Sequence, residues 1–594
     1  MNAEQRHQKA TKRVSRTAVL FFSLIVISAA IAQLPTATVL GVVKDSSGAV
    51  MPKANLTARN VETGQTRTTV ASGDGSYRFA ALPVGSYEIR VENPGFESAI
   101  RMGLTLTVGQ EAVVDFTLQV GAVEQTVAVT AEAPMVNTTS GSLGGLVGEQ
   151  TVADLPLNGR NYADLTLLQP GITQYRSFSL GTTVTGTLFS SNGAPIAANN
   201  YLLDGAIMQA WHGLTTASFS NSTLGVEGIR EWRMVTNAFS AEYGLTMGSQ
   251  IMIVSKSGTN TFHGSAFEYL RNSALDARNF FDYQTIASSG RLPPFKRNNF
   301  GGSFGGPIKK NKTFLFGVYE VVRQRLGLTT ISNTIPVSYK VDGGLVPQIA
   351  PTIKPLLALY PNPNLPNNQL TFPFTQPSNE QYGQMRVDQN FSTNDSMFAR
   401  YTIYHDELTS PLAFPQFSQT SVSRYQYGTL SENHVFSPSL LNTARFSYSR
   451  SKTSLVSPSG ITGPQYSFVP GLEIGTINIG AVSLFGPAGT APNAKLQNIR
   501  QWSDDLFYTR GRHSLKFGGS FNRWQTFSLN GTNKLGQATF PSITSFLLAQ
   551  PSTFTAITPG AILDRLYGYN TFASYLQDDL RVRSNLTLNL GLRY

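Results

Sequence analysis

Apolar and polar residues alternate along much of the C-terminal part of the chain. The alternation is strict in residues 441–450, 514–524 and 586–594, where every second side chain is apolar. This period of two predicts β-strands with one apolar and one polar face. Long stretches rich in Ser, Gly and Pro separate the strands, at residues 406–424, 452–496 and 526–566.

Strands of about ten residues, with short turns at one end and long loops at the other, are typical of a transmembrane β-barrel. A soluble β-sandwich alternates in the same way, but loops this long are uncommon in one. The pattern therefore favours an antiparallel barrel over residues 262–594, with room for about ten to fourteen strands.

A second kind of strand pattern occupies residues 36–118. Short strand-like runs recur there at a spacing of about ten residues, separated by Gly and Asp turns, which predicts a small β-sandwich. The segment Gly73-Asp74-Gly75 can be read as a calcium loop or as a tight turn. The ligand spacing of a calcium loop is missing, so a tight turn is favoured.

Two further segments lie between the sandwich and the barrel. Residues 121–134 alternate with Val127 and Val129 on one side, between a Gly and a Pro. The segment is either the last strand of the sandwich or a hinged linker that another protein captures by strand addition, and the pattern leaves both open. Residues 136–261 mix helix-like and strand-like runs, which predicts a compact α/β unit.

The N-terminus has the pattern of an export signal. Five Lys and Arg residues precede an apolar run at residues 18–27, and the small residues Ala30-Ile31-Ala32 follow it. This arrangement predicts a signal peptide over residues 1–32, cleaved between Ala32 and Gln33. The apolar run is shorter than the roughly 20 residues that a membrane-spanning helix needs.

Composition narrows the class of protein further. The 594 residues include no Cys, 14% are charged and 11% are aromatic, with a formal net charge of +11. The absence of Cys excludes disulfides, zinc ribbons and thiol catalysis. The positive charges are scattered among acids without a basic stripe, so nucleic acid is not an expected partner. Low charge with many aromatic residues suits a sheet-rich exported protein.

An enzymatic interpretation has one motif in its favour. Residues 301–305 match the G-x-S-x-G nucleophile elbow, which needs a strand before it and a helix after it. Pro307 follows almost at once and prevents that helix. The six His residues are isolated and lack metal-ligand spacing. We therefore expect no enzyme activity, no cofactor and no metal.

Several segments together resemble a known family. Residues 41–48, 73–79, 82–87 and 94–96 resemble the carboxypeptidase-regulatory-like, or carbohydrate-binding-like, fold. Residues 155–162 (LPLNGRNY) and 299–320 (NFGGSFGGPIKKNKTFLFGVYE) look like hallmarks of TonB-dependent outer-membrane receptors of the Oar-like type.

The resemblance implies a mainly β fold with an N-terminal β-sandwich, a small α/β plug and a C-terminal antiparallel transmembrane β-barrel. Its parts are a signal peptide (1–32), the regulatory-like module (36–119), a linker (120–135), the plug (136–261) and the barrel (262–594). Such receptors close a barrel of about 22 strands around the plug. The residues after the plug are too few for that, so we expect an incomplete barrel and a truncated chain, with a smaller, complete barrel as the alternative.

The resemblance also implies a function. The chain is expected to lie in the outer membrane, in contact with its lipid, and to take up an extracellular ligand, with a tilt toward carbohydrate, when TonB pulls on the plug. Glu124, Gln125, Thr126, Val127, Ala128, Val129, Thr130 and Ala131 are similar to a TonB box. Tyr201, Asp204 and Trp211 in plug loops are candidate ligand contacts, with filling of the plug core as the alternative. The rival function is a secreted or surface β-rich adhesin that binds glycans.

Overall fold

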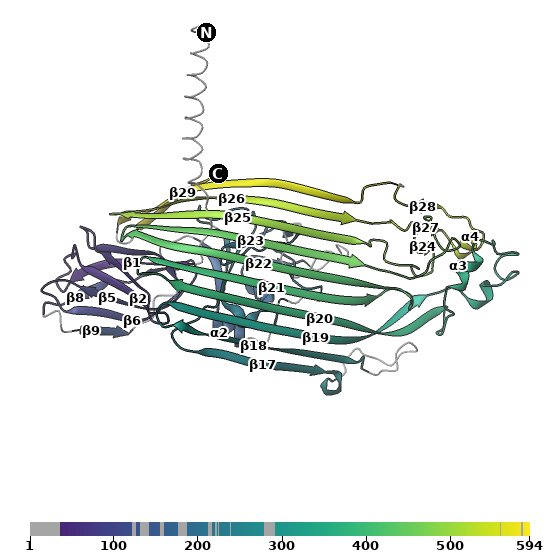
Figure 1. Ribbon diagram of the computed structural model, residues 1–594, viewed down its shortest axis with the longest axis horizontal. Coiled ribbons are helices and arrows are strands. Elements are labelled where there is room, and N and C mark those ends of the chain that lie inside the picture. The colour runs from purple at the N-terminus through teal and green to yellow at the C-terminus, as the bar shows by residue number, and fades with distance from the viewer. Residues whose placement is uncertain are drawn as a thin grey trace, which may run out of the picture.

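A computed structural model presents the chain as a long sheet with a small domain at one end and a layer of loops at the other (Figure 1). The structure describes residues 36–121, 126–130, 142–154, 160–175, 187–211, 217–219, 223, 225–237, 239–277, 292–558, 560–583 and 586–594. The predicted fold class, mainly β with an N-terminal β domain and a large antiparallel sheet, is confirmed.

The N-terminal domain is a sandwich of two sheets. The strands are β1 (Thr36–Asp45), β2 (Asn55–Asn60), β3 (Thr66–Val70), β4 (Ser76–Pro83), β5 (Gly85–Glu92), β6 (Ser98–Leu106), β7 (Glu111–Val113), β8 (Phe116–Leu118) and β9 (Thr126–Thr130). One sheet has the order β4-β1-β7, with β8 also on β1, and the other has the order β3-β2-β5-β6-β9. Val39, Leu56, Ile89 and Leu104 fill the core between them with no exposed surface. Alternating strands and Gly-Asp turns therefore fold as the pattern predicts.

The segment predicted to be the plug, which keeps that name below, is built on a five-stranded mixed sheet of order β10-β15-β16-β13-β14. Its strands and a separate small pair are β10 (Leu143–Gly148), β11 (Ile172–Gln174), β12 (Phe189–Ser191), β13 (Asn200–Leu203), β14 (Ala206–Ile207), β15 (Ile229–Asn237) and β16 (Gln250–Ser255). Its helical turns are α2 (Glu149–Asp154), η2 (Tyr162–Leu168), η3 (Ile196–Ala198) and η5 (Val226–Gly228). Trp232 and Met234 form the centre of its apolar core.

Eleven antiparallel strands make the large sheet, here called the wall. They follow chain order except where loop strands intervene: β17 (His263–Asn272), β18 (Phe295–Lys309), β19 (Thr313–Asn333), β20 (Gln369–Asn390), β21 (Asp395–Pro411), β22 (Ser418–Ser437), β23 (Leu440–Val456), β25 (Asn493–Arg510), β26 (His513–Asn530), β29 (Asp564–Arg583) and β30 (Leu586–Arg593). The plug packs on one face of the wall, here called the lumen face, and the opposite face is called the outer face (Figure 1).

Nine of the eleven described wall strands are longer than the ten residues predicted, so that prediction is wrong for them. β19 has 21 residues and β20 has 22. The segment 406–424, predicted to be a loop, is largely strand, because β21 continues to Pro411 and β22 begins at Ser418. Near the long-loop end both faces of these strands carry polar residues. The backbone hydrogen bonds between the strands therefore continue beyond the point where apolar and polar residues stop alternating.

The remaining long connections fold into a layer at the end of the wall opposite the N-terminal domain (Figure 1). The layer contains β24 (Thr476–Ile479), β27 (Gln537–Phe540), β28 (Thr553–Thr555), η7 (Val337–Tyr339), α3 (Lys354–Ala358) and α4 (Ile543–Leu547), and η6 (Ser273–Leu275) follows β17. Tyr360 stacks on Phe485 with ring centroids 4.1 Å apart, and Phe414 and Phe546 pack around them. These loops share one aromatic core.

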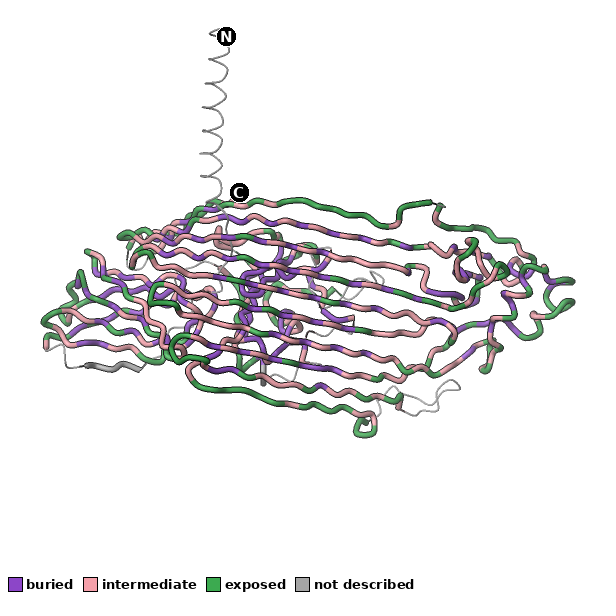
Figure 2. The backbone as a smooth tube through the Cα atoms, viewed as in Figure 1, coloured by how far each residue is buried: buried purple, intermediate pink, exposed green. Residues whose placement is uncertain are grey.

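The wall begins at β17 and ends at β30, and within the described residues these two strands do not pair with each other. Figure 2 shows the exposed residues concentrated along the two outermost strands, whereas the inner strands alternate between buried and partly buried residues. Eleven strands lie within the predicted range. Helices long and apolar enough to cross a membrane do not occur in the described part of the chain.

Candidate functional site

The plug contacts the wall through a buried ion pair at Asp204. The Leu203-Asp204-Gly205-Ala206 turn joins β13 to β14, with φ of 49° at Asp204 and 78° at Gly205. Asp-Gly is a preferred pair for a two-residue hairpin with positive φ at both positions. This turn delivers the Asp204 carboxylate to the wall, where Arg400 Nε lies 2.6 Å from it, and both side chains are completely buried.

Hydrogen bonds from Ser255 satisfy the Asp204 carboxylate, and two wall hydroxyls satisfy Arg400. Ser255 of β16 donates to Asp204 from its backbone N–H at 2.9 Å and from its hydroxyl at 2.7 Å. Arg400 also donates to the hydroxyls of Thr402 and Thr429, at 2.8 and 2.7 Å. Arg386, 3.7 Å from Asp204, adds a second positive charge. A buried ion pair is tolerated when further hydrogen bonds satisfy both partners, as they do here.

Electrostatics keeps this carboxylate charged. Burial alone would raise the pKa of Asp204, but the guanidinium groups of Arg400 and Arg386 and the hydrogen bonds from Ser255 hold that pKa below its ordinary value. The ion pair between plug and wall therefore stays intact across neutral pH.

Elsewhere the wall holds the plug by its backbone. Ser449 donates to the carbonyl of Ile207 at 2.6 Å, and Gln384 donates to the carbonyl of Gly228 at 3.2 Å. The Glu320 carboxylate accepts from the backbone N–H of Gly225 at 3.0 Å. Buried backbone groups of irregular segments need partners, and the lumen face supplies them from polar side chains.

The three candidate ligand residues lie in different surroundings. Tyr201 is part of strand β13 and not of a loop, is 7% exposed, and packs edge-on against Phe189 in the plug core. Asp204 is held by the wall as described. Trp211 is partly exposed and faces Lys495 of the wall, whose ammonium nitrogen lies 5.2 Å from the ring centroid. A role in ligand binding stays a prediction for all three.

The lumen face beside Trp211 and toward the loop layer carries neutral polar groups. Hydroxyl and amide side chains occupy neighbouring register positions around Lys495, namely Ser451, Thr453, Gln497, Thr526 and Ser528. On the same face Trp524 stacks on Tyr569, with centroids 5.5 Å apart and an interplanar angle of 7°. Flat aromatic surfaces thus occur beside neutral hydrogen-bonding groups.

A second interface joins the plug to the N-terminal domain. Arg230 of the plug makes a two-pronged contact with Glu62, at 2.8 and 2.7 Å. Val108 donates its backbone N–H to the Glu231 carboxylate, and Arg233 donates to the Val108 carbonyl at 2.6 Å. The N-terminal domain therefore docks on plug strand β15 through charged groups.

Glu231 differs from Asp204 in its balance of charges. Burial raises the pKa of Glu231 to about 7, and the hydrogen bond from Val108 and the nearby Arg230 and Arg233 lower it only in part. A carboxyl with this pKa changes its protonation state within the physiological range.

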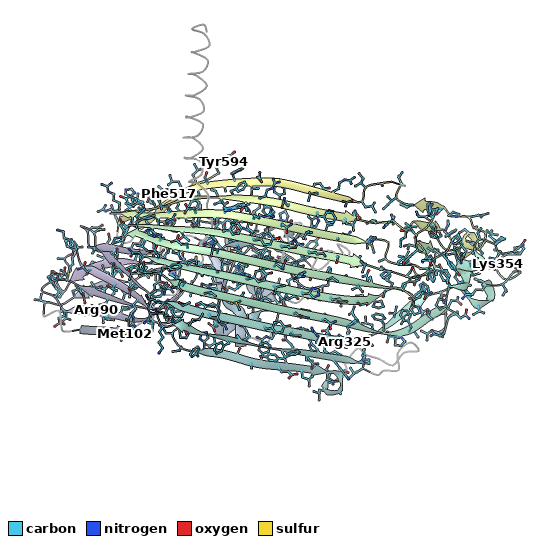
Figure 3. The ribbon with its side chains drawn as sticks, in the orientation of Figure 1. Arg90, Met102, Arg325, Lys354, Phe517 and Tyr594 are labelled. Carbon is cyan, nitrogen blue, oxygen red and sulfur yellow. The ribbon has the colours of Figure 1, made fainter. Side chains whose placement is uncertain are left out.

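The strand that resembles a TonB box lies on the N-terminal domain. Thr126–Thr130 forms β9, which pairs in parallel with β6 from Ser98↔Thr126 to Met102↔Thr130. β9 ends the sheet order, so within the described residues its other edge is unpaired. Figure 3 labels Met102 at this margin of the domain. Glu124, Gln125 and Ala131 lie outside the described residues, as do Ala32 and Gln33 of the predicted cleavage site.

The remaining motifs have simple surroundings. Residues 301–305 lie inside strand β18, which continues to Lys309, so the strand-to-helix turn of a nucleophile elbow is not formed. Asp74 accepts from the backbone N–H and hydroxyl of Ser76, as in a tight turn. Asp395, Glu432 and His434 lie close enough together to hold a metal ion, and His434 hydrogen-bonds to Asp395.

Sequence reasoning missed Arg400 and Arg386, the partners of Asp204. A usable signal was present in β21, where Arg400, Thr402 and Tyr404 share one face of the strand. A charged residue on a face that a plug covers requires a partner of opposite charge. The pattern could not say which plug residue would meet it.

Known protein families match the N-terminal domain and the wall separately. The outer membrane beta barrel domain family matches residues 254–594, and the carboxypeptidase regulatory-like domain family matches residues 38–119. The TonB-dependent transporter Oar of Myxococcus xanthus is 25% identical over 321 residues, which cover 52% of this chain and 29% of Oar. The resemblances to the regulatory-like fold and to Oar are thus confirmed.

The crystal structure of the outer membrane transporter YddB from Escherichia coli superposes with a TM-score of 0.52 at 13% identity, covering 76% of this chain and 56% of YddB. The chain spans less than a third of the length of Oar. Both proteins are described as transporters, which agrees with the prediction that the chain is not an enzyme. Because the barrel family matches more than half of the sequence, this protein belongs to the outer membrane beta barrel domain family and is located in the outer membrane.

Proposed function

We propose that the protein takes part in TonB-dependent uptake of an extracellular ligand, with the plug as the moving part. The observation that carries the proposal is the position of β9, an edge strand that directly precedes the plug and pairs with β6 over five residues. An unpaired strand edge is the element that a partner captures by strand addition. The relation to Oar supports the same function.

In this mechanism TonB pairs with residues 124–131 and pulls on the chain that leads into β10 of the plug. The force reaches the plug from the short-turn end, where the N-terminal domain is docked. The wall contacts of the plug are hydrogen bonds and ion pairs to side chains, which can break and re-form without covalent chemistry.

A binding experiment tests this proposal. The C-terminal domain of TonB is immobilised, and the full chain in detergent is passed over it with increasing amounts of a synthetic peptide of residues 124–131. We expect retention of the chain, which the peptide abolishes and a scrambled peptide of equal composition does not. Retention that the peptide leaves unchanged would refute the assignment of the box.

For the ligand we propose a carbohydrate, bound on the loop side of the plug next to Trp211. Aromatic rings and neutral hydroxyl and amide groups suit the apolar faces and hydroxyls of a sugar, and Trp211, Gln497 and Ser528 offer this combination. Tyr201 and Asp204 support the site from the plug core in this proposal.

Titration of the full chain with a panel of oligosaccharides, and with ferric siderophores as the competing class, tests the ligand. We expect saturable binding of an oligosaccharide that Trp211→Ala weakens about tenfold, because stacking on an aromatic face contributes on the order of 1 kcal/mol. Trp502→Ala, which removes a tryptophan from the outer face, is the matched control. Binding of a siderophore instead would refute the carbohydrate.

A further inference from the structure

The outer face of the wall has an ordered pattern of its own. Phe446, Trp502, Phe521 and Phe572 are direct cross-strand partners on β23, β25, β26 and β29. Their neighbouring ring centroids are 5.4, 5.4 and 4.9 Å apart, and we call them the aromatic row. A row of outward aromatic residues is a feature of barrel surfaces that face lipid.

A group of basic residues follows directly on the long-loop side of this row. Alternation along the strands places all of its members on the outer face. We call these residues the basic patch: Arg424, Arg450, Lys452, Arg500 and Arg523.

The register of the sheet sets like charges against each other in the basic patch. Arg424 lies directly opposite Lys452, and Arg500 lies directly opposite Arg523. Like charges directly across a strand pair are destabilising. Two such pairs of opposed positive charges occur, one on β22 and β23 and one on β25 and β26. This arrangement indicates that a negatively charged group from outside the protein binds between the opposed side chains.

The protein itself supplies little of that negative charge. Arg500 donates to Gln525 at 2.6 Å and Arg523 donates to Asn570 at 3.0 Å, and both acceptors are neutral. The nearest outward carboxylate in the register of the sheet is Glu407, which lies two positions beyond His405, the partner of Arg424. The described residues show no ion pair between Glu407 and the basic patch.

The position of the basic patch along the wall strands indicates where the anion would come from. Leu515 and Phe517 face outward near the short-turn end, and Arg523 follows Leu515 by eight residues on the same strand. Eight residues of strand tilted at about 40° rise about 21 Å, close to the roughly 25 Å of a barrel's apolar band. Figure 3 shows Phe517 near the N-terminal-domain end of the wall and Arg325, another outward arginine, toward the loop end. The patch therefore lies at the outer edge of the membrane.

We propose that the basic patch binds the phosphate groups of a phosphorylated glycolipid in the outer leaflet, with its acyl chains along the aromatic row. Guanidinium groups bind phosphate in a two-pronged geometry, and each phosphate between two opposed cations would relieve their repulsion. The lipid would thus hold strands β22 to β26 in register at this height.

The test measures lipid binding by the full chain, stripped of lipid in a neutral detergent. Diphosphoryl lipid A and its dephosphorylated form are titrated, and the bound lipid and the thermal midpoint of unfolding are followed. We expect the diphosphoryl form to bind about tenfold more tightly and to raise the midpoint. Equal affinity for the two forms would overturn the proposal.

A variant carrying Arg424→Gln, Lys452→Gln, Arg500→Gln and Arg523→Gln should lose that preference. A control with Lys309→Gln, Lys310→Gln, Lys312→Gln and Arg510→Gln removes four positive charges at the opposite rim and should keep it. Without lipid, the patch variant should be at least as stable as the wild type, because opposed charges are removed. A lower lipid-free midpoint would mean that the patch is structural and would overturn the proposal.

Inorganic phosphate at millimolar concentration separates the lipid from a simple anion. We expect it to leave the midpoint of the wild type unchanged. A rise equal to that caused by diphosphoryl lipid A would assign the patch to free phosphate and would overturn the lipid.

Discussion

The plug has two interfaces, and they are built differently. Toward the wall, Asp204 and Arg400 are completely buried, and each has further hydrogen-bond partners. Toward the N-terminal domain, the Arg230 and Glu62 side chains are 19% and 25% exposed, and water competes for their charges. The contact with the N-terminal domain should therefore separate at a lower cost than the contact with the wall.

This difference predicts the order in which the two interfaces separate. In the proposed mechanism, a force applied to β9 acts on the N-terminal domain before it acts on the plug, because β9 belongs to the sheet of that domain. Undocking of the domain can thus precede any movement of the plug.

The largest effect is expected at the wall. Arg400→Met leaves the Asp204 carboxylate buried without its main partner, which typically costs about 3–5 kcal/mol. Amide hydrogen exchange of β13 and β16 should rise strongly, because the plug opens more often. Arg325→Met, an exposed arginine on β19, is the matched control and should leave the exchange unchanged.

A double variant guards against simple misfolding of the Arg400→Met chain. Asp204→Leu combined with Arg400→Met replaces the pair by apolar residues, which is often close to neutral for a buried ion pair. Recovery of protection in the double variant would tie the loss to the unpaired charge. If Arg400→Met alone keeps full protection, the pair does not hold the plug.

The next effect is a pH dependence at the interface between the plug and the N-terminal domain. The pKa of Glu231 is raised to about 7 in the folded protein from an ordinary value of 4.5. Its favourable contribution is therefore complete below the ordinary pKa and is lost as the pH rises through about 7, by up to about 3 kcal/mol. Docking of the domain can be measured by fluorescence energy transfer between the domain and a turn of the wall. It should weaken between pH 5 and pH 8, and Glu231→Gln should remove most of this pH dependence.

The wall interface should not change over the same pH range. The pKa of Asp204 is held below its ordinary value of 3.8, so its contribution is present above that value and is lost only as the pH falls further. Exchange of β13 should therefore stay constant from pH 5 to pH 8, after correction for intrinsic rates. A parallel change at both interfaces would remove the distinction between them.

A smaller effect is expected for Glu62→Gln. Loss of the two-pronged contact with Arg230 should destabilise docking by about 1 kcal/mol, since both groups are partly exposed. Glu88→Gln, which removes the partner of Arg59 on the same domain, is the control. Equal changes in docking for the two variants would show that the contact between Arg230 and Glu62 does not stabilise docking.

The smallest effect concerns β9 itself. Five parallel pairs at a sheet edge hold it, whereas β5 is paired on both sides. Backbone amides of Thr126–Thr130 should exchange faster than those of Gly85–Glu92 under native conditions. Protection of β9 equal to that of β5 would mean that the strand is not readily available to a partner.

Much of the architecture was predictable because it depends on local chemistry. Alternation predicted the wall, Gly-Asp turns predicted the sandwich, and the Asp204-Gly205 pair is itself a hairpin signal. The strand lengths were underestimated, because a strand with two polar faces leaves no period of two to detect. The fold of the long loops into one layer was also missed, since Tyr360, Phe414 and Phe546 come from three separate connections.

The sequence by itself determined the strand faces, the turn chemistry and the absence of thiol chemistry, because these depend on residue type and spacing. Tertiary structure decided the partners: Asp204 with Arg400, Glu62 with Arg230, and Arg424 opposite Lys452. Such pairs join residues far apart in the chain or depend on the register of two strands. A one-residue change of register would move each wall side chain to the opposite face, so only the assembled sheet sets which charges meet.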